Sequence, residues 1–333
     1  METRKLTEGA LLSALQVVLG LILLSTGLGY SLYLELLLPI TMTAVYLRCG
    51  AKYGLLAGLN TILLIAFCFG DIIGAVYMGQ ALAFGFLCGY LIERKGNLHD
   101  DLMLASLIGC IFLLILDALT ARIVGFSLLD TDGLDEIFVL IPGETEQMFE
   151  VIFYISIAAI PIATVLMTYV GGLLLGHRMG LLRGEALEKY RVIRYFKIIF
   201  PHSYHSKRVL YQAIIGSILC LGLWPVVNGG YSKALVATSG IVLLYFVLND
   251  YTKLIAQYLV NQGKQPALVS LLHFLVLVSL VNAFYVTACL LVLIGCCVDM
   301  RTSTREREQQ VLAFYLREHL RLKNQTQMTL RKI

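Results

Sequence analysis

Charged side chains are scarce in this sequence. Asp, Glu, Lys and Arg make up 14% of its 333 residues, whereas a typical soluble domain contains about 25%. Hydrophobic residues make up 58%, and no stretch is polar enough to form a separate soluble domain of useful size. The net charge of +4 is small and gives no indication of a nucleic-acid partner. Composition therefore predicts a membrane protein rather than two soluble domains.

Motifs for catalysis, metal binding and nucleotide hydrolysis are also missing. The eight cysteines include no C-x-x-C pair and lie mostly in apolar runs, where a free thiol behaves as a small hydrophobic side chain. His202 and His205 form H-x-x-H in a basic loop, but no nearby Cys or carboxylate completes a metal site. No P-loop, G-x-S-x-G or H-E-x-x-H motif occurs. We therefore expect no enzyme activity, no metal and no cofactor, and any active transport needs a partner ATPase or an ion gradient.

Long apolar runs fill most of the chain. A helix needs roughly 20 apolar residues to cross a hydrocarbon core about 30 Å thick. Continuous runs of this length favour helices over the alternating strands of a barrel, so we predict an all-α, polytopic transmembrane helical bundle. The predicted spans are residues 9–28, 30–48, 52–70, 72–92, 102–124, 148–176, 209–227 and 234–254, followed by a last apolar stretch from about 267 to 298.

Basic residues indicate the orientation, because Lys and Arg collect in the cytoplasmic loops of membrane proteins. With the N-terminus placed in the cytoplasm, every Lys and Arg except Arg122 and Lys233 falls on the cytoplasmic side. The connection 125–150 contains seven acids and no Lys or Arg, as expected of an outer segment. We therefore predict a multi-pass protein of the cell membrane with a cytoplasmic N-terminus.

The hydropathy and charge pattern divides the chain into four parts. Residues 1–176 form a six-helix bundle, 177–208 a basic cytoplasmic connector, 209–300 a second bundle and 301–333 a basic tail. The connector repeats apolar residues at helical spacing among Lys and Arg, which suits a helix in the headgroup layer or one that docks a partner. The stretch 267–298 is either one span or two short arms. Two arms return the tail to the cytoplasm, and we favour them.

Four polar residues fall within predicted spans of the first bundle, where an ionisable group costs on the order of 2.5–3.5 kcal/mol. Glu35 and Asp117 lie in the outer halves of their helices, and Asn60 and Gln80 lie near the midplane. Together they predict a polar cavity, open to the outside, that binds a small cationic or hydroxyl-rich ligand, with Asp117 as the charge anchor. Interhelical hydrogen bonding is the alternative role for Asn60 and Gln80, and contact with surface water is the alternative for Glu35.

The first and last spans resemble those of a known family. Residues 3–15, TRKLTEGALLSAL, are similar to the start of the YybS-type family of predicted bacterial membrane proteins, and Gly295 and the run Asp299-Met300-Arg301 resemble the close of its last span. The first half is also distantly similar in layout to the substrate-binding (S) components of energy-coupling-factor (ECF) transporters. These resemblances imply a bacterial inner-membrane location and an outward cavity for a vitamin or metal ion.

The ECF resemblance also implies a docking face. In S-components, an A-x-x-x-A face on the first helix meets a transmembrane coupling subunit that works with ATPases, and Ala10 and Ala14 match that spacing here. Close packing within the bundle is the alternative role for these small residues. The helices after Arg208 extend beyond the six of an S-component.

Two functions from different classes follow. The first is a transport-associated membrane protein that binds a small solute in an outward-facing cavity without its own ATPase. The second is a non-transporting scaffold or regulator, whose basic connector and tail hold cytoplasmic or lipid partners. Co-purification distinguishes them, because the first predicts a coupling subunit with ATPases and the second predicts a signalling or division protein.

The topology can be tested with reporter fusions or cysteine labelling. We expect Asp132 and Glu144 to lie outside and Arg191 to lie inside, because the acidic connection and the basic connector belong on opposite sides of the membrane. A connector found on the outer face would overturn the whole topology. A reporter after Arg331 that reads as external would overturn only the two-arm interpretation of 267–298.

Overall fold

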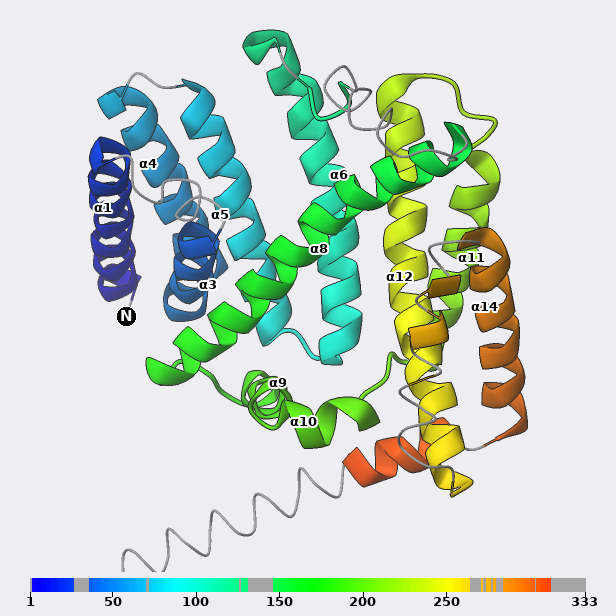
Figure 1. Cartoon of the computed structure of the whole chain (residues 1–333). Coiled ribbons are helices and arrows are strands. Elements are labelled where there is room, and N and C mark those ends of the chain that lie inside the picture. Colours follow the sequence, from blue (N-terminus) through cyan, green and yellow to red (C-terminus); the bar gives the residue numbers. More distant parts are fainter. Residues whose placement is uncertain are drawn as a thin grey trace, which may run out of the picture. The chain divides into compact units, whose positions relative to one another are not determined.

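The computed structural model describes residues 2–26, 36–69, 72–125, 127–130, 146–263, 271, 274–276, 278–279, 284–302 and 304–312. Its elements are α1 (Glu2–Thr26), α3 (Leu38–Cys49), α4 (Ala51–Phe69), α5 (Ile72–Glu93), α6 (Leu98–Val124), α8 (Glu146–Arg178), α9 (Glu185–Arg194), α10 (Phe196–Ile199), the 3₁₀ turn η2 (Phe200–His202), α11 (Lys207–Leu223), α12 (Gly230–Asn261) and α14 (Phe284–Arg301) (Figure 1). Residues 304–312 are also helical. No strand occurs in this described part, and the predicted all-α class is confirmed.

Five of these helices are long and apolar enough to cross a membrane. The qualifying stretches are Thr3–Ile22, Leu98–Arg122, Phe149–Arg178, Gly230–Asn261 and Phe284–Arg301, and the shorter apolar helices Ala51–Phe67 and Met78–Glu93 accompany them. The chain is therefore a membrane protein with several membrane-embedded helices. Part of the stretch 267–298 lies outside the described residues, so the choice between one span and two arms stays a prediction.

Contacts group the chain into two compact units. Unit 1 comprises Met1–Tyr190 and Gly216–Val242, and unit 2 comprises Arg191–Ile215 and Leu243–Ile333. Helices α11 and α12 therefore contribute residues to both units. Our four-part division follows hydropathy and charge and stays a prediction about how the chain is disposed in the membrane.

Helix α3 is central to unit 1, where it packs against α1, α4, α5 and α8 (Figure 1). Apolar residues that it buries include Leu38, Met42 and Val45, which join a core with residues of α1, α4 and α5. The hydroxyl of Thr43 donates hydrogen bonds to the carbonyl oxygens of Pro39 and Gly85, each at 2.9 Å. This polar residue therefore lies inside the bundle without an unsatisfied donor.

Glycines on α5 permit the close approach of α3. A Cβ atom added at Gly85 would overlap the backbone carbonyl of Pro39. A Cβ added at Gly89 would lie 2.7 Å from both Cβ and Cγ of Tyr46. Small residues four apart allow two membrane helices to pack backbone to backbone, and Gly85 and Gly89 have this spacing. The α3–α5 contact therefore depends on the absence of two side chains.

Gly89→Ala should destabilise the protein by about 1–3 kcal/mol, because the rigid ring base of Tyr46 cannot move away from the new methyl group without separating the helices. Gly79→Ala on the same helix is the control. Its Cβ would lie 3.6 Å from Ile62 Cδ1, an ordinary contact, so it should be neutral or stabilising by up to about 1 kcal/mol. Unfolding of the purified variants in detergent measures both, and equal stability of the two variants would contradict the packing argument.

Candidate functional site

Asp117 lies near the predicted outer end of α6 and is the centre of a polar cluster in unit 1. Helix α6 ends at Gly125, whose φ of +74° lies in the left-handed region that glycine adopts readily, and its N–H caps the carbonyl of Ala121 at 2.9 Å. The chain thereby reverses, and residues 127–130 fold back over the Asp117 side chain. That side chain is only 9% exposed.

The Asp117 carboxylate accepts hydrogen bonds from three neutral groups. The N–H of Leu128 lies 3.0 Å from Oδ1, the hydroxyl of Ser127 lies 2.8 Å from Oδ2, and the hydroxyl of Tyr231 lies 3.0 Å from Oδ2. The two hydroxyl oxygens are 2.9 Å apart. Residues from the end of α6, the turn after it and the start of α12 thus meet at one negative charge.

The turn is itself ordered by short-range hydrogen bonds. The Ser127 N–H donates to Asp130 Oδ2 at 2.8 Å, and the Leu129 N–H donates to Ser127 Oγ at 3.0 Å. Ser and Asp in such turns commonly bond to the backbone in this way. Ser127 is therefore held in place by the turn and directed toward Asp117.

No ion pair forms at Asp117 within the described part of the chain. Lys233, one of the two basic residues predicted to lie outside, pairs instead with Glu150, which also accepts a hydrogen bond from the Trp224 indole at 3.3 Å. Arg122, the other, is exposed. The cluster therefore carries a buried negative charge surrounded by hydroxyl and amide donors, an arrangement that complements a small cation or a hydroxyl-rich molecule.

The other predicted ligand-binding residues are dispersed or lie outside the description. Glu35 is among the residues that the structure does not describe. Asn60 is exposed on α4, and Gln80 is half-buried on α5. Helices α4 and α6 each pack against α5. The hydrogen bonds to Asp117 come from Ser127, Leu128 and Tyr231 and not from Asn60. A shared cavity formed by these residues stays a prediction.

Sequence reasoning missed Ser127 and Tyr231. Ser127 carried a weak signal, since Ser followed three residues later by Asp130 is typical of a turn. Tyr231 carried no signal, because 114 positions separate it from Asp117. Its approach depends on which helix ends meet in space.

A second polar cluster of unit 1 connects α1 to α3 and α4. The hydroxyls of Ser13 and Thr61 lie 2.9 Å apart, Thr61 donates to Gln16 Oε1 at 3.2 Å, and Gln16 donates to Thr41 at 3.1 Å. Ser13 and Gln16 thus occupy the inward face of α1, whereas Ala10 and Ala14 are exposed on it. These interhelical hydrogen bonds hold α1 in the bundle.

A buried lysine fixes the first part of the connector, up to Tyr190, within unit 1. Lys189 of α9 is 4% exposed, and its ammonium donates to the carbonyl oxygens of Leu91 at 2.7 Å and Arg94 at 2.6 Å. It also pairs with Asp101 at 2.6 Å, and Asp101 accepts a hydrogen bond from Tyr169 at 2.8 Å. A cation at the C-terminal end of α5 is favoured by the helix dipole. The start of α9 is therefore buried within unit 1.

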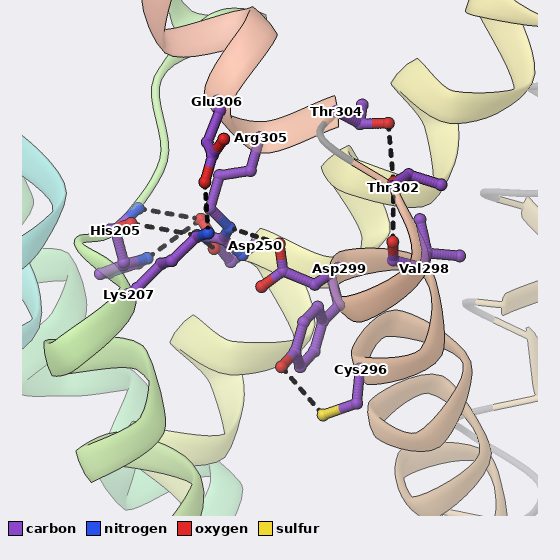
Figure 2. A network of polar contacts seen from close by, with 11 residues as sticks. His205, Lys207, Asp250, Cys296, Val298, Asp299, Thr302, Thr304, Arg305 and Glu306 are labelled. Carbon is purple, nitrogen blue, oxygen red and sulfur yellow. Dashed lines mark hydrogen bonds and ion pairs between the residues drawn. The ribbon is translucent and has the colours of Figure 1, made fainter.

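Unit 2 contains an ion centre formed by Asp250, His205, Arg305 and Asp299 (Figure 2). Asp250 of α12 is fully buried; its Oδ2 lies 2.8 Å from Arg305 Nη1 and its Oδ1 lies 3.1 Å from His205 Nδ1. Arg305 Nε donates to Asp299 Oδ1 at 3.1 Å, and Nη1 donates to the carbonyl of His205 at 3.0 Å. This centre attaches the helical segment 304–312 to α12 and to the last turn of α14.

The guanidinium of Arg305 stays protonated despite its burial. Burial by itself lowers the pKa of the guanidinium, but Asp250 and Asp299 outweigh this effect and raise the pKa above its ordinary value. Sequence spacing gives Asp250 a neighbour at i+3, Lys253, but does not reveal Arg305 or His205. Lys253 lies over the ring of Phe200, 3.7 Å from its centre.

Comparison with known proteins gives one match. A family described as "Predicted membrane protein (DUF2232)" matches residues 12–135, which include α3 to α6, Asp117 and Ser127. No curated protein and no solved structure matches the chain. The match agrees with the membrane-embedded helices and assigns no activity.

Arg305→Met should destabilise unit 2 by about 3–5 kcal/mol, because it leaves Asp250 and Asp299 buried without their cation. The segment 304–312 should detach, and trypsin should then cleave after Arg307 faster than in the wild type. Adding Asp250→Asn and Asp299→Asn should restore much of the stability. Arg301→Met, an exposed residue with the same charge, is the control, and an unchanged cleavage rate in Arg305→Met would contradict the assignment.

Proposed function

We propose that this chain is a non-enzymatic, transport-associated membrane protein whose first unit binds a small cationic or hydroxyl-rich solute at an outward-facing site centred on Asp117. The proposal rests on the surroundings of the Asp117 carboxylate. It is buried, it accepts hydrogen bonds from Ser127, Leu128 and Tyr231, and no cation of the described chain pairs with it.

Other buried acids of the described chain form ion pairs. Asp101 pairs with Lys189, Asp250 pairs with Arg305, and Glu308 pairs with His202. A buried charge without a counter-ion is costly, and hydrogen bonds from neutral donors reduce this cost without removing the charge. A cationic ligand supplies the missing charge at Asp117. The hydroxyls of Ser127 and Tyr231 then offer oxygen atoms to the same ligand.

The proposal also includes a partner that supplies the energy for transport. The sequence contains no P-loop, so transport requires a partner. Ala10 and Ala14 lie exposed on α1 while Ser13 and Gln16 face the bundle, which leaves a smooth face for a transmembrane coupling subunit that works with ATPases. We place the protein in a bacterial inner membrane with both termini in the cytoplasm, in keeping with its basic connector and tail.

A scaffold or regulator is the second candidate. Buried ion pairs fix both the connector helix α9 and the segment 304–312, and rigid cytoplasmic helices suit the recruitment of a cytoplasmic or lipid partner. This candidate requires no ligand at Asp117, so ligand binding separates the two.

Thermal stability of the purified protein tests the proposal. A panel of small organic cations, metal ions and hydroxylated metabolites should include one that raises the melting temperature of the wild type, since a ligand at 100 times its Kd adds about 2.7 kcal/mol. Asp117→Asn removes the charge and keeps the size, so the shift should disappear. Tyr231→Phe should weaken it less.

Glu150→Gln is the matched control, because Glu150 is another acid predicted to lie on the outer side but already pairs with Lys233. Its ligand-dependent shift should match that of the wild type. If Asp117→Asn is more stable than the wild type and no compound shifts either protein, Asp117 only anchors the turn 127–130 and the proposal fails.

A further inference from the structure

In unit 2, most of the described acidic side chains are buried, whereas many basic side chains are exposed. Its described residues include four acids, and three of them lie inside: the side chains of Asp250, Asp299 and Glu308 are 0%, 3% and 5% exposed. The fourth, Glu306, is exposed and pairs with Lys207 at 2.8 Å, and this ion pair lowers the pKa of Glu306.

Basic side chains remain on the surface of the same unit. The exposed ones in the described part are Arg194, Lys197, Lys207, Arg208, Arg301 and Arg307. We name three of them, Arg208, Arg301 and Arg307, the basic collar. Among the described acids of unit 2, Asp250, Asp299 and Glu308 are enclosed, and the exposed Glu306 is already paired with Lys207, which is not a collar residue.

Each collar residue follows a residue of the ion centre closely in sequence. Arg208 follows His205 by three residues, Arg301 follows Asp299 by two, and Arg307 follows Arg305 by two. Consecutive Cα atoms are about 3.8 Å apart, so each collar backbone lies within about 12 Å of a residue of the centre. The hydrogen bonds of the centre hold these three chain segments together (Figure 2).

The collar also lies where apolar helices end. Arg208 is at the start of α11, and Arg301 is the last residue of α14. Large side chains next to it are exposed: Met300, which precedes Arg301, and Tyr211, which lies one turn into α11. Apolar and aromatic side chains beside Lys and Arg are typical of the boundary between hydrocarbon and headgroups.

Unit 1 does not separate its charges in this way. On its predicted cytoplasmic side, the exposed basic residues Arg94, Lys95 and Arg178 share the surface with exposed acids, of which Glu93 and Glu188 are examples. In unit 2, by contrast, the one exposed acid among the described residues, Glu306, is paired with Lys207.

We propose that the basic collar of unit 2 binds the phosphate groups of anionic lipids in the adjacent leaflet. Arginine suits this ligand, because its planar guanidinium forms paired hydrogen bonds with phosphate. Each basic residue near an anionic membrane surface contributes about 1 kcal/mol. The ion centre favours the site in two ways: it encloses Asp250 and Asp299, which would otherwise repel a phosphate, and it joins the three chain segments that carry the arginines. This inference does not depend on the Asp117 proposal.

The test compares lipids that differ in charge. The full chain, purified in a non-ionic detergent, is heated with phosphatidylglycerol or with phosphatidylcholine at equal concentration. Phosphatidylglycerol should raise the melting temperature of the wild type more than phosphatidylcholine does, and the difference should shrink as salt is added, because salt screens exposed charges. Inorganic phosphate at the same concentration should have no such effect.

Two triple variants locate the effect. Arg208→Gln with Arg301→Gln and Arg307→Gln should lower the affinity for phosphatidylglycerol on the order of a hundredfold, which is three contributions of about 1 kcal/mol. The control removes three charges from unit 1: Arg94→Gln, Lys95→Gln and Arg178→Gln. It should bind phosphatidylglycerol as the wild type does.

Three outcomes overturn the proposal. They are equal stabilisation by the two lipids, equal loss of affinity in the two triple variants, and stabilisation by inorganic phosphate that matches phosphatidylglycerol. Should the collar variant fail to fold, the salt series on the wild type and the single variant Arg208→Gln decide the question, because neither disturbs the buried ion centre.

Discussion

The architecture depends on one constraint, the cost of placing a charge where water cannot reach it. Hydrocarbon and the packed interior both lack the solvation that an ion needs. The chain meets this cost by pairing its buried charges across segments that are distant in sequence. Lys189 and Asp101 join the start of α9 to α6 within unit 1. Arg305, Asp250 and Asp299 join the segment 304–312 to α12 and α14. These ion pairs specify which segments lie against which.

Asp117 differs from these buried acids because no basic residue of the described chain pairs with it. Its hydrogen bonds satisfy its oxygen atoms, but none of the donors carries a charge. A structural turn anchor does not require an ionised side chain, since an uncharged amide also accepts hydrogen bonds. An acid at this position is therefore the observation on which the proposed ligand site rests. The small-residue packing of α3 against α5 supports this site indirectly, because α5 positions α6 in the same unit.

The cost of burial also shapes the surface. An acid that pairs inside the protein no longer offsets the arginines outside it, so the formation of the ion centre changes the charge that unit 2 presents. Net charge computed from the sequence does not show this effect. It counts Asp250 and Arg301 equally, although one is enclosed and the other is exposed.

The sequence by itself determined the helical class and the membrane location, because hydropathy is a local property. It also singled out Asp117 as a candidate, because an intramembrane acid is costly. Only the tertiary structure decided the partners. Tyr231 reaches Asp117 across 114 positions, and Arg305 reaches the carbonyl of His205 across 100. The sequence grouped Asn60 with Asp117 as a supporting residue, but the hydrogen bonds to Asp117 come from Ser127, Leu128 and Tyr231. Spacing along one helix cannot predict which helix ends meet, since that depends on the packing of the whole bundle.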